Sequence, residues 1–216
     1  MRILITAGPT REPLDPVRFL SNRSSGRMGY ALAEAALAAG HEVVLISGPV
    51  SLSPPPGAVL VPVETARQMF EAVAEHISSS HIAIMTAAVA DYRPKTTAGQ
   101  KIKKSAESLT LELERTEDIL GSARPQFGFR GFLVGFAAET ENLLENAREK
   151  LARKDCDLII ANDVTQPGIG FDSAENAVTL CFPGGRALPL PRQTKTGLAR
   201  ALLAEIIPLA QKKTAS

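Results

Sequence analysis

The sequence predicts an α/β protein in which helices cover both faces of a mostly parallel sheet. Short apolar runs without regular alternation suit strands that are buried on both faces, and they cover residues 2–6, 42–47, 59–63, 82–86, 132–136 and 157–161. Amphipathic stretches with apolar residues three and four positions apart lie between them, at residues 26–39, 66–78 and 142–154. Because strands and helices alternate in this way, we expect three layers with the sheet in the middle.

Two regions interrupt the alternation. Residues 91–104 contain Pro94, Gly99 and a concentration of lysine with almost nothing to bury, which predicts a long basic flap that extends to about residue 108. From Leu109 onward the run Leu-Thr-Leu-Glu-Leu-Glu alternates strictly, as expected for a strand with one solvent-exposed face.

The end of the chain predicts an antiparallel extension of the sheet. Residues 177–182 and 187–190 flank a Pro-Gly-Gly turn and are expected to pair, and residues 194–211 are expected to form an amphipathic closing helix. The chain length is near the upper end of an ordinary single domain. These elements predict one domain over residues 1–216, with a Rossmann-like three-layer fold, a basic flap and an antiparallel extension.

The composition argues against several classes of protein. Lys and Arg total 24 and Asp and Glu total 23, so the net charge of +1 provides no long-range attraction for nucleic acid or an anionic membrane. No apolar stretch approaches the roughly 18 residues that cross a bilayer, and the apolar run within residues 1–7 is too short for the core of a signal peptide. Cys156 and Cys181 lie in apolar stretches without metal-like spacing, which favours buried free thiols. We therefore expect a cytoplasmic protein that captures any anionic ligand locally.

The first helix begins at small and hydroxyl side chains that suit a phosphate group. A long loop follows the first strand, and the run Ser24-Ser25-Gly26 then opens the helix. In open α/β sheets, ligands lie beyond the carboxyl ends of the strands, and a helix N-terminus has free N–H groups for a phosphate. Ser24 and Ser25 offer hydroxyl donors, while Gly26 and Gly29 permit close approach. The alternative is that Ser24 only caps the helix.

Two further side chains of this loop have chemistry for a charged ligand. Asn22 carries two donors and an acceptor and can hold a carbonyl or phosphoryl oxygen as charge develops on it; the alternative is a turn residue. Arg18 can clamp a phosphate or a carboxylate, and the alternative is a solvated arginine.

Small side chains at residues 86–90 follow the fourth strand and leave room for a ligand. Asp91 comes next and suits a ribose hydroxyl or a divalent metal on phosphates, or else caps a turn. Lys101, Lys103 and Lys104 place three ammonium groups close together, and these groups repel one another unless they bind an anion. The alternative is an ordinary solvated face. A helix terminus contributes at most about 2 kcal/mol toward an anion, whereas millimolar affinity requires about 4 kcal/mol, so the flap lysines would have to contribute.

Two common phosphate-binding motifs are missing from the sequence. No Gly-x-Gly-x-x-Gly follows the first strand and no acidic residue ends the second strand, as a dinucleotide-binding fold requires, and there is no Walker loop. An NAD(P)-dependent oxidoreductase is therefore an alternative that lacks its fingerprint. A non-catalytic nucleotide-binding module is a second alternative.

Six short motifs follow one another in a fixed order along the chain. They are Ile-Thr-Ala-Gly-Pro-Thr-Arg-Glu, Ser-Asn-Arg-Ser-Ser-Gly, Ala-Ala-Val-Ala-Asp-Tyr-Arg-Pro, Lys-Ile-Lys-Lys, Val-Gly-Phe-Ala-Ala-Glu-Thr and Ala-Asn-Asp-Val, at residues 5–12, 21–26, 87–94, 101–104, 134–140 and 161–164. Each motif is weak alone, but the ordered set closely resembles phosphopantothenate–cysteine ligase in its bacterial form, over most of the chain.

This resemblance implies a two-step ligation in coenzyme A biosynthesis. The carboxylate of 4′-phosphopantothenate attacks the α-phosphate of a nucleoside triphosphate, CTP in typical bacterial members, which releases pyrophosphate and leaves an acyl-nucleotidylate (acyl-CMP). The amine of L-cysteine then displaces the nucleoside monophosphate and forms an amide. Mg²⁺ is expected to neutralise the triphosphate and to be held largely by phosphates and waters, with Asp91 as the candidate protein ligand.

The matching motifs also imply roles for individual residues. Asn22 would act on the acyl-nucleotidylate and Lys101 on the phosphates, both as catalytic residues, with Arg18 and Ala88 near the pantothenate moiety. The implied nucleotide site consists of Ser24, Met85, Thr86, Ala87, Asp91, Lys101, Glu117, Asp118, Ile119, Leu120, Phe136, Lys150 and Lys154. The last two lysines are four positions apart on one helix face, which permits joint contact with a ligand; ordinary surface lysines are the alternative.

The chain departs from the family pattern at two points. It has Thr116-Glu117-Asp118-Ile119 where members commonly have Asn-Pro-Asp-Ile, which bears on the choice between CTP, which is favoured, and ATP. Bacterial relatives usually carry an N-terminal flavin-dependent decarboxylase domain, whereas Met1 here begins at the first ligase strand, so we expect that domain to be a separate protein or to have been removed. Members of the family are dimers, and the resemblance implies a homodimer in which the partner subunit completes the active site.

Overall fold

The computed structural model describes residues 1–104, 107–139, 141–163 and 173–214. Residues 105–106 of the predicted flap, and Thr140 and Val164 of the matching motifs, lie outside the described residues.

An eight-stranded sheet forms the centre of the described structure, with the order β12-β11-β10-β9-β6-β1-β4-β5. Adjacent strands from β10 to β5 are parallel; these strands are β1 (Arg2–Ala7), β4 (Glu42–Ser47), β5 (Val59–Pro62), β6 (Ile82–Met85), β9 (Phe132–Glu139) and β10 (Leu158–Asp163). The predicted antiparallel extension consists of β11 (Glu175–Cys181) and β12 (Ala187–Thr194), joined through the short 3₁₀ helix η1 (Pro183–Gly185). The predicted fold class is therefore confirmed.

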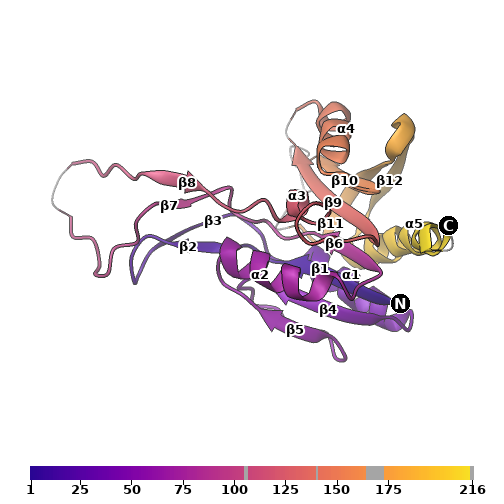
Figure 1. The fold of residues 1–216 in the computed structure, drawn as a ribbon, viewed down its shortest axis with the longest axis horizontal. Coiled ribbons are helices and arrows are strands. Elements are labelled where there is room, and N and C mark those ends of the chain that lie inside the picture. Colours follow the sequence, from indigo (N-terminus) through magenta and orange to yellow (C-terminus); the bar gives the residue numbers. More distant parts are fainter. Residues whose placement is uncertain (105–106, 140, 164–172, 215–216) are drawn as a thin grey trace.

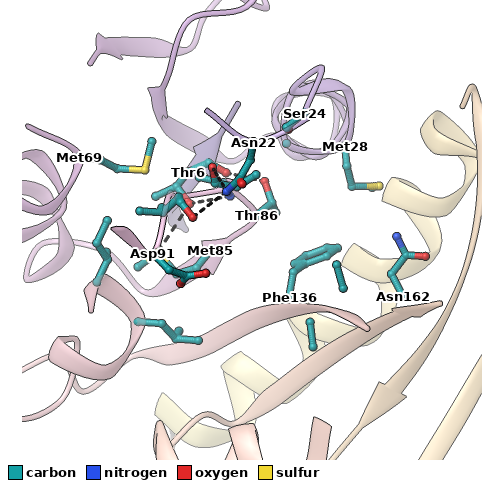
Figure 2. A pocket seen from close by; sticks show the side chains of 18 of the residues that line it. Thr6, Asn22, Ser24, Met28, Met69, Met85, Thr86, Asp91, Phe136 and Asn162 are labelled. Atoms are coloured by element: carbon teal, nitrogen blue, oxygen red, sulfur yellow. Dashed lines mark hydrogen bonds between the residues drawn. The ribbon is translucent and has the colours of Figure 1, made fainter. Parts of the chain in front are cut away.

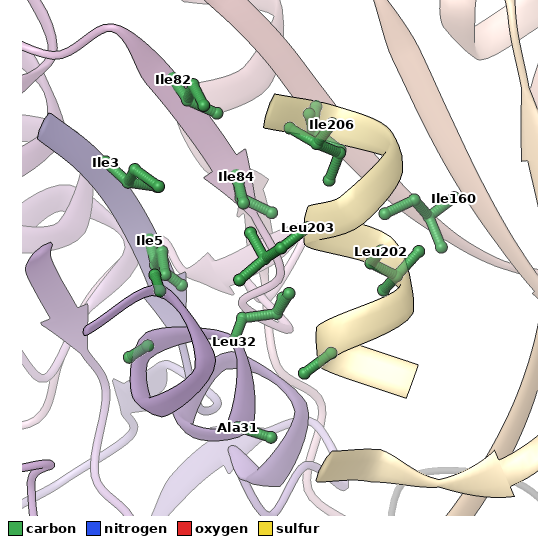
Figure 3. Packing of buried hydrophobic residues seen from close by; sticks show 14 of the residues in the cluster. Ile3, Ile5, Ala31, Leu32, Ile82, Ile84, Ile160, Leu202, Leu203 and Ile206 are labelled. Atoms are coloured by element: carbon green, nitrogen blue, oxygen red, sulfur yellow. The ribbon is translucent and has the colours of Figure 1, made fainter. Parts of the chain in front are cut away.

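Helices cover both faces of this sheet (Figure 1). One face carries α1 (Arg27–Ala38) and α5 (Lys195–Thr214), and the other carries α2 (Ala66–Ile77), α3 (Ile119–Ser122) and α4 (Leu143–Arg153). Ile3 and Ile5 belong to the core beneath α1 and α5 (Figure 3), whereas Leu4 between them belongs to the core on the opposite face. Both faces of the strand are buried, which explains why the apolar runs of the central strands do not alternate.

Two short antiparallel pairs reach away from the body of the protein (Figure 1). They are β2 (Arg11–Pro13) with β3 (Phe19–Ser21), and β7 (Tyr92–Pro94) with β8 (Leu113–Arg115). We call the described parts of residues 11–21 and 92–115 the arm. It includes the predicted flap as well as most of the long loop that was expected between the first strand and the first helix.

The strand predicted to begin at Leu109 is wrong in its extent, because β8 begins only at Leu113. Leu109, Leu111 and Leu113 are 59%, 37% and 43% exposed, and the residues between them are exposed too, so the described structure covers neither side of the alternating run. An alternating pattern indicates a half-buried strand only where some surface covers its apolar face.

Other expectations concern the cysteines and the membrane. Cys156 and Cys181 are free and buried, as predicted. None of the helices in the described part of the chain combines the length and the apolarity that a membrane crossing requires.

Candidate active site

A cleft of about 910 Å³ opens at the carboxyl ends of β1, β6, β9 and β10. From β1 the chain proceeds to β4 and β5 on one side of the sheet and then returns to β6 on the other side of β1. Ligands of open α/β sheets bind where the strand order reverses in this way, and the volume is in the range of small-molecule sites. The fold therefore directs attention to the space between the ends of β1 and β6 (Figure 2).

The first turn of α1 forms one wall of the cleft. Gly26, just before the helix, has a φ of 73°, a left-handed conformation that glycine adopts readily. Gly29 lies so close to β1 that a Cβ on it would be 2.5 Å from the Cβ of Ala7. Ser24 accepts a hydrogen bond from the N–H of Gly26 at 3.4 Å but does not cap the helix. Ser24, Ser25 and the first turn of α1 line the cleft, and the N–H groups at the start of a helix suit a phosphate.

Asn22 is held against the main chain that leaves β6. Its Nδ2 donates to the carbonyl oxygens of Val89 at 2.9 Å and Ala88 at 3.2 Å. The Nδ2 donors of Asn22, which the sequence suggested for a developing oxyanion, are therefore already used within the protein. The Oδ1 atom of Asn22 accepts no hydrogen bond from the described residues. In Figure 2, Asn22 and Ser24 lie on one side of the cleft, and Phe136 and Asp91 lie on the other. What Asn22 offers a ligand in this structure is an acceptor.

The structure brings together most of the residues that the sequence predicted for the site. The cleft is lined by Asn22, Ser24, Met85, Thr86, Ala87, Ala88, Asp91, Glu117, Asp118, Ile119, Leu120, Phe136, Lys150 and Lys154. Lys150 of α4 and Lys154, which caps the C-terminus of this helix, both face the cleft. The Lys150 ammonium donates to the carbonyl oxygen of Phe136 at 2.8 Å, and the Lys154 ammonium forms an ion pair with Asp118. Their spacing of one helical turn thus places two cations on one wall.

Two of the three acidic side chains in the cleft are already paired. Burial alone would raise the pKa of Glu117, but hydrogen bonds from its own N–H and from Arg93 bring the pKa below its ordinary value. Burial would likewise raise the pKa of Asp118, but the hydrogen bonds from Lys154 and from the N–H of Gly121, together with the nearby positive charges, bring this pKa below its ordinary value. Asp91 is exposed and forms no ion pair within the described residues. It is therefore the carboxylate with most freedom to meet a cation.

Cationic side chains outnumber acidic ones around the cleft. Among the described residues, the lining contains seven cationic residues, Arg23, Arg27, Arg115, Lys150, Arg153, Lys154 and Lys195, against the three acidic residues Asp91, Glu117 and Asp118. The whole chain carries a net charge of only +1. Positive charge is thus concentrated locally, where it attracts and retains an anionic ligand.

Arg18 and Lys101 do not line this cleft. Both belong to the arm. The guanidinium of Arg18 is bonded to Asp15 and to the carbonyl oxygen of Ile102, next to Lys101, whose side chain is exposed. The structure therefore places Arg18 against the main chain next to Lys101, whereas Asn22 lines the cleft.

Four buried polar residues of the described structure line the cleft and were not predicted for the site. They are Thr6, Asn162, Asn176 and Lys195, which are 2%, 8%, 4% and 7% exposed. The Oδ1 atom of Asn162 is buried without a hydrogen-bond partner in the described structure, and Figure 2 shows this side chain near Phe136 and Met28. Asn162 belongs to the Ala-Asn-Asp-Val motif, whose polar residues at the end of an apolar strand were the signal that could have identified it.

The fold and the cleft define a class: an α/β protein with a cationic cleft, at a helix N-terminus beyond the carboxyl ends of its strands, that suits a phosphorylated ligand. More specifically, the chain belongs to the family of the DNA/pantothenate metabolism flavoprotein C-terminal domain, whose pattern matches residues 1–209. The family resemblance found in the sequence is thereby confirmed.

Individual relatives agree with this assignment. The chain is 50% identical over 214 residues to the coenzyme A biosynthesis bifunctional protein CoaBC of Bacillus subtilis (strain 168), covering 97% of this chain and 52% of that protein. It is also 50% identical over 211 residues to CoaBC of Escherichia coli (strain K12), covering 96% of this chain and 52% of that protein. The chain thus spans about half the length of these curated relatives. The crystal structure of the C-terminal domain of a CoaBC protein is 44% identical, has a TM-score of 0.83, and covers 98% of this chain and 96% of that one.

Proposed function

We propose that this chain is a phosphopantothenate–cysteine ligase, which joins 4′-phosphopantothenate and L-cysteine through an acyl-nucleotidylate in coenzyme A biosynthesis. The observation that carries the proposal is the composition of the cleft, where the N-terminus of α1 and an excess of cations lie beside Asn22. Family membership and the 50% identity to the B. subtilis relative support the same chemistry.

The first step requires alignment and charge neutralisation rather than a covalent catalyst. A carboxylate must approach the α-phosphate of a triphosphate, and both reactants are anions that repel each other. The N–H groups of α1 and Ser24 would hold phosphate oxygens, and cations such as Lys150 and Lys154 would offset the remaining negative charge. The small side chains of Ala87 and Ala88 leave room for the pantothenate carboxylate beside the nucleotide.

The second step places a specific demand on Asn22. The amine nitrogen of cysteine gains positive charge as it forms a bond to the acyl carbon. The bond between this carbon and the phosphate oxygen breaks, and its electrons leave with the nucleoside monophosphate. With both Nδ2 hydrogens engaged by Ala88 and Val89, Asn22 can accept a hydrogen bond from this nitrogen through Oδ1. Such a bond orients the amine and stabilises its developing charge.

CTP is the nucleotide we propose, with Mg²⁺ as its counter-ion. No three His, Cys, Asp or Glu side chains form a potential metal cluster within the described ranges, and Glu117 and Asp118 are engaged in ion pairs. The residues present therefore fit an ion that is held mainly by phosphates and waters, with Asp91 as the protein ligand. When bound, Mg²⁺ would neutralise triphosphate charge. Comparison of kcat/KM for CTP and ATP tests the choice of nucleotide.

A homodimer would resolve the separation between the arm and the cleft. Arg18 and Lys101 lie outside the cleft of their own chain, and the arm exposes apolar side chains, including Phe19, Tyr92 and Leu111 at 45%, 47% and 37%. Exposed apolar surface of this kind is typical of a protein interface. We propose that arms of two chains pack together and that each completes the partner's site. A Leu111→Lys variant should then lose both activity and the dimer in light scattering, and a fully active monomer would contradict the proposal.

The proposed substrates and product also bear on where the protein works and on which enzyme acts next. Nucleoside triphosphates and reduced cysteine are cytoplasmic compounds, which supports a cytoplasmic location. The amide product retains the cysteine carboxylate, so we propose a flavin-dependent decarboxylase as the enzyme that acts next.

The half-reactions separate the ligase from a protein that only binds nucleotide. Without cysteine, the wild-type chain should form acyl-CMP and pyrophosphate from 4′-phosphopantothenate and CTP, as detected by mass spectrometry. Asn22→Asp places a carboxylate oxygen against the carbonyl oxygens of Ala88 and Val89 and should stall the second step, so that acyl-CMP persists when cysteine is added. Equal turnover of the variant and the wild type would contradict the role of Asn22.

A further inference from the structure

Asp15 is a buried carboxylate at the centre of the arm, and the roles proposed above leave it unused. Its side chain is fully buried, although it lies on a loop between β2 and β3. A buried charge on such a short loop must be compensated by hydrogen bonds and opposite charge. The identity of its partners shows what this carboxylate holds in place.

Five hydrogen bonds converge on Asp15. Oδ1 accepts the main-chain N–H groups of Val17 at 2.8 Å and Arg18 at 2.9 Å. Oδ2 accepts Nε of Arg18 at 3.0 Å, Nη2 of Arg18 at 2.6 Å and the main-chain N–H of Ile102 at 3.1 Å. One carboxylate thus binds the loop of the β2–β3 hairpin and a segment 87 positions further along the chain.

Ile102 is fixed from both sides by the same pair of residues. While its N–H donates to Asp15, its carbonyl oxygen accepts Nη2 of Arg18 at 2.9 Å. The adjoining chain is also attached to the hairpin, because Thr97 donates to the carbonyl oxygen of Pro13 at 3.1 Å. The main chain beside Lys101 is therefore fixed, whereas the Lys101 side chain is exposed. Arg18 is itself 43% exposed, so both cations can reach a ligand.

We propose that Asp15 is a positioning residue that holds Arg18 and the main chain beside Lys101 in one arrangement, so that the two cations meet the anionic substrate as a unit. This inference rests on the proposed function, which assigns Arg18 to the pantothenate substrate and Lys101 to the phosphates. The hydrogen bond from Arg18 also holds the pKa of Asp15 far below its ordinary value, so the carboxylate stays charged throughout the neutral range.

Asp15→Asn is the direct test, because it keeps the shape of the side chain. Both oxygens of Asp15 accept hydrogen bonds from N–H donors, so the amide nitrogen of asparagine faces donors in either orientation, and at least one contact to Arg18 is lost. Calorimetric titration with 4′-phosphopantothenate is expected to show a rise in Kd of about tenfold, with a similar rise in its KM and little change in kcat, as for a lost charged contact.

Coupling to Arg18 distinguishes positioning from a general loss of structure. If Asp15 acts through Arg18, the double variant Asp15→Asn with Arg18→Ala should bind no more than about twofold more weakly than Arg18→Ala alone. Additive losses, or an unchanged Kd in Asp15→Asn, would overturn the proposal. A wild-type chain that does not bind 4′-phosphopantothenate would overturn it as well. Binding without any ligation would instead contradict only the proposed function.

Asp157→Asn is a matched control. This carboxylate also accepts hydrogen bonds from an arginine, Arg124, and from the main-chain N–H of Leu133, both at 2.7 Å. It lies directly before β10, at the amino ends of the strands, whereas the cleft opens at their carboxyl ends. The Asp157→Asn variant should therefore have a lower melting temperature than the wild type and an unchanged Kd for 4′-phosphopantothenate.

If Asp15→Asn does not fold, the variant Arg18→Lys tests the same proposal. Arg18→Lys keeps the charge but loses the two-pronged hydrogen bond to Asp15. Trypsin should then cleave faster after Lys101, Lys103 and Lys104, together with a raised Kd. Unchanged cleavage and an unchanged Kd would overturn the proposal.

Discussion

Replacing Gly29 with alanine tests whether the close contact between α1 and β1 positions the phosphate cradle. The new Cβ would lie 2.5 Å from the Cβ of Ala7 and 2.7 Å from Oγ1 of Thr86. Carbon atoms pack best at about 3.5 to 4.0 Å, so the start of α1 must move by roughly 1 Å, and the Ala7 methyl group cannot rotate out of the way. Overpacking of this kind costs about 1 to 3 kcal/mol, and each kcal/mol lowers the melting temperature of a chain of this size by about 2 to 4 °C.

The expected effect on activity is larger than the loss of stability alone would produce. A displacement of about 1 Å in a positioning element can reduce the rate about a hundredfold, so steady-state assays with CTP should show a fall in kcat/KM of that order. Gly128→Ala is the control: Gly128 has a φ of +63° and no atom within 4 Å of an added Cβ. Alanine there should cost about 1 to 2 kcal/mol of stability through backbone strain alone and leave kcat/KM unchanged. If Gly29→Ala kept both the wild-type melting temperature and kcat/KM, the assigned contact between α1 and β1 would be incorrect.

Two further predictions concern charges around the cleft and the buried thiols. Lys150→Ala and Lys154→Ala should each raise the KM for the nucleotide by about tenfold, the loss expected for one charged contact, without altering the KM for cysteine; an unchanged nucleotide KM in both variants would remove α4 from the site. Burial raises the pKa of Cys156 to about 12, so at pH 8 only about one thiol in ten thousand is ionised, and iodoacetamide should label Cys156 in the native protein far more slowly than in urea. Rapid labelling of the native chain, followed by peptide mass spectrometry, would contradict its burial.

The central sheet was predictable because its strands are buried on both faces. A run such as β1 is apolar at nearly every position, and this local composition needs no knowledge of its neighbours. The strands of the arm have no such signal. β2, β3 and β7 have three residues each and expose much of their surface, so pairing with a partner strand, rather than local sequence, determines them. The same limit explains the error at Leu109, where the alternation is real but the apolar side chains stay exposed in the part of the chain that the structure describes.

The candidate site was predictable where its residues sit in compact motifs. Asn22, Ser24 and Asp91 stand in motifs next to the ends of β1 and β6, and strand ends are where open sheets bind ligands. Asn176 and Lys195 come from the antiparallel edge and the last helix, and their burial is a property of the folded chain that no local pattern reveals. The main-chain partners of Asn22 were equally inaccessible to sequence reasoning. They change its available group from a donor to an acceptor.

The most direct test of the central claim is ligation by this chain itself. Purified protein would be incubated with 4′-phosphopantothenate, L-cysteine, Mg²⁺ and one nucleoside triphosphate at a time, and the products followed by mass spectrometry. We predict an amide of 4′-phosphopantothenate and cysteine, formed together with equal amounts of pyrophosphate and CMP when CTP is supplied. Absence of the amide with every nucleoside triphosphate, from a folded protein that binds CTP, would contradict the assignment as a ligase.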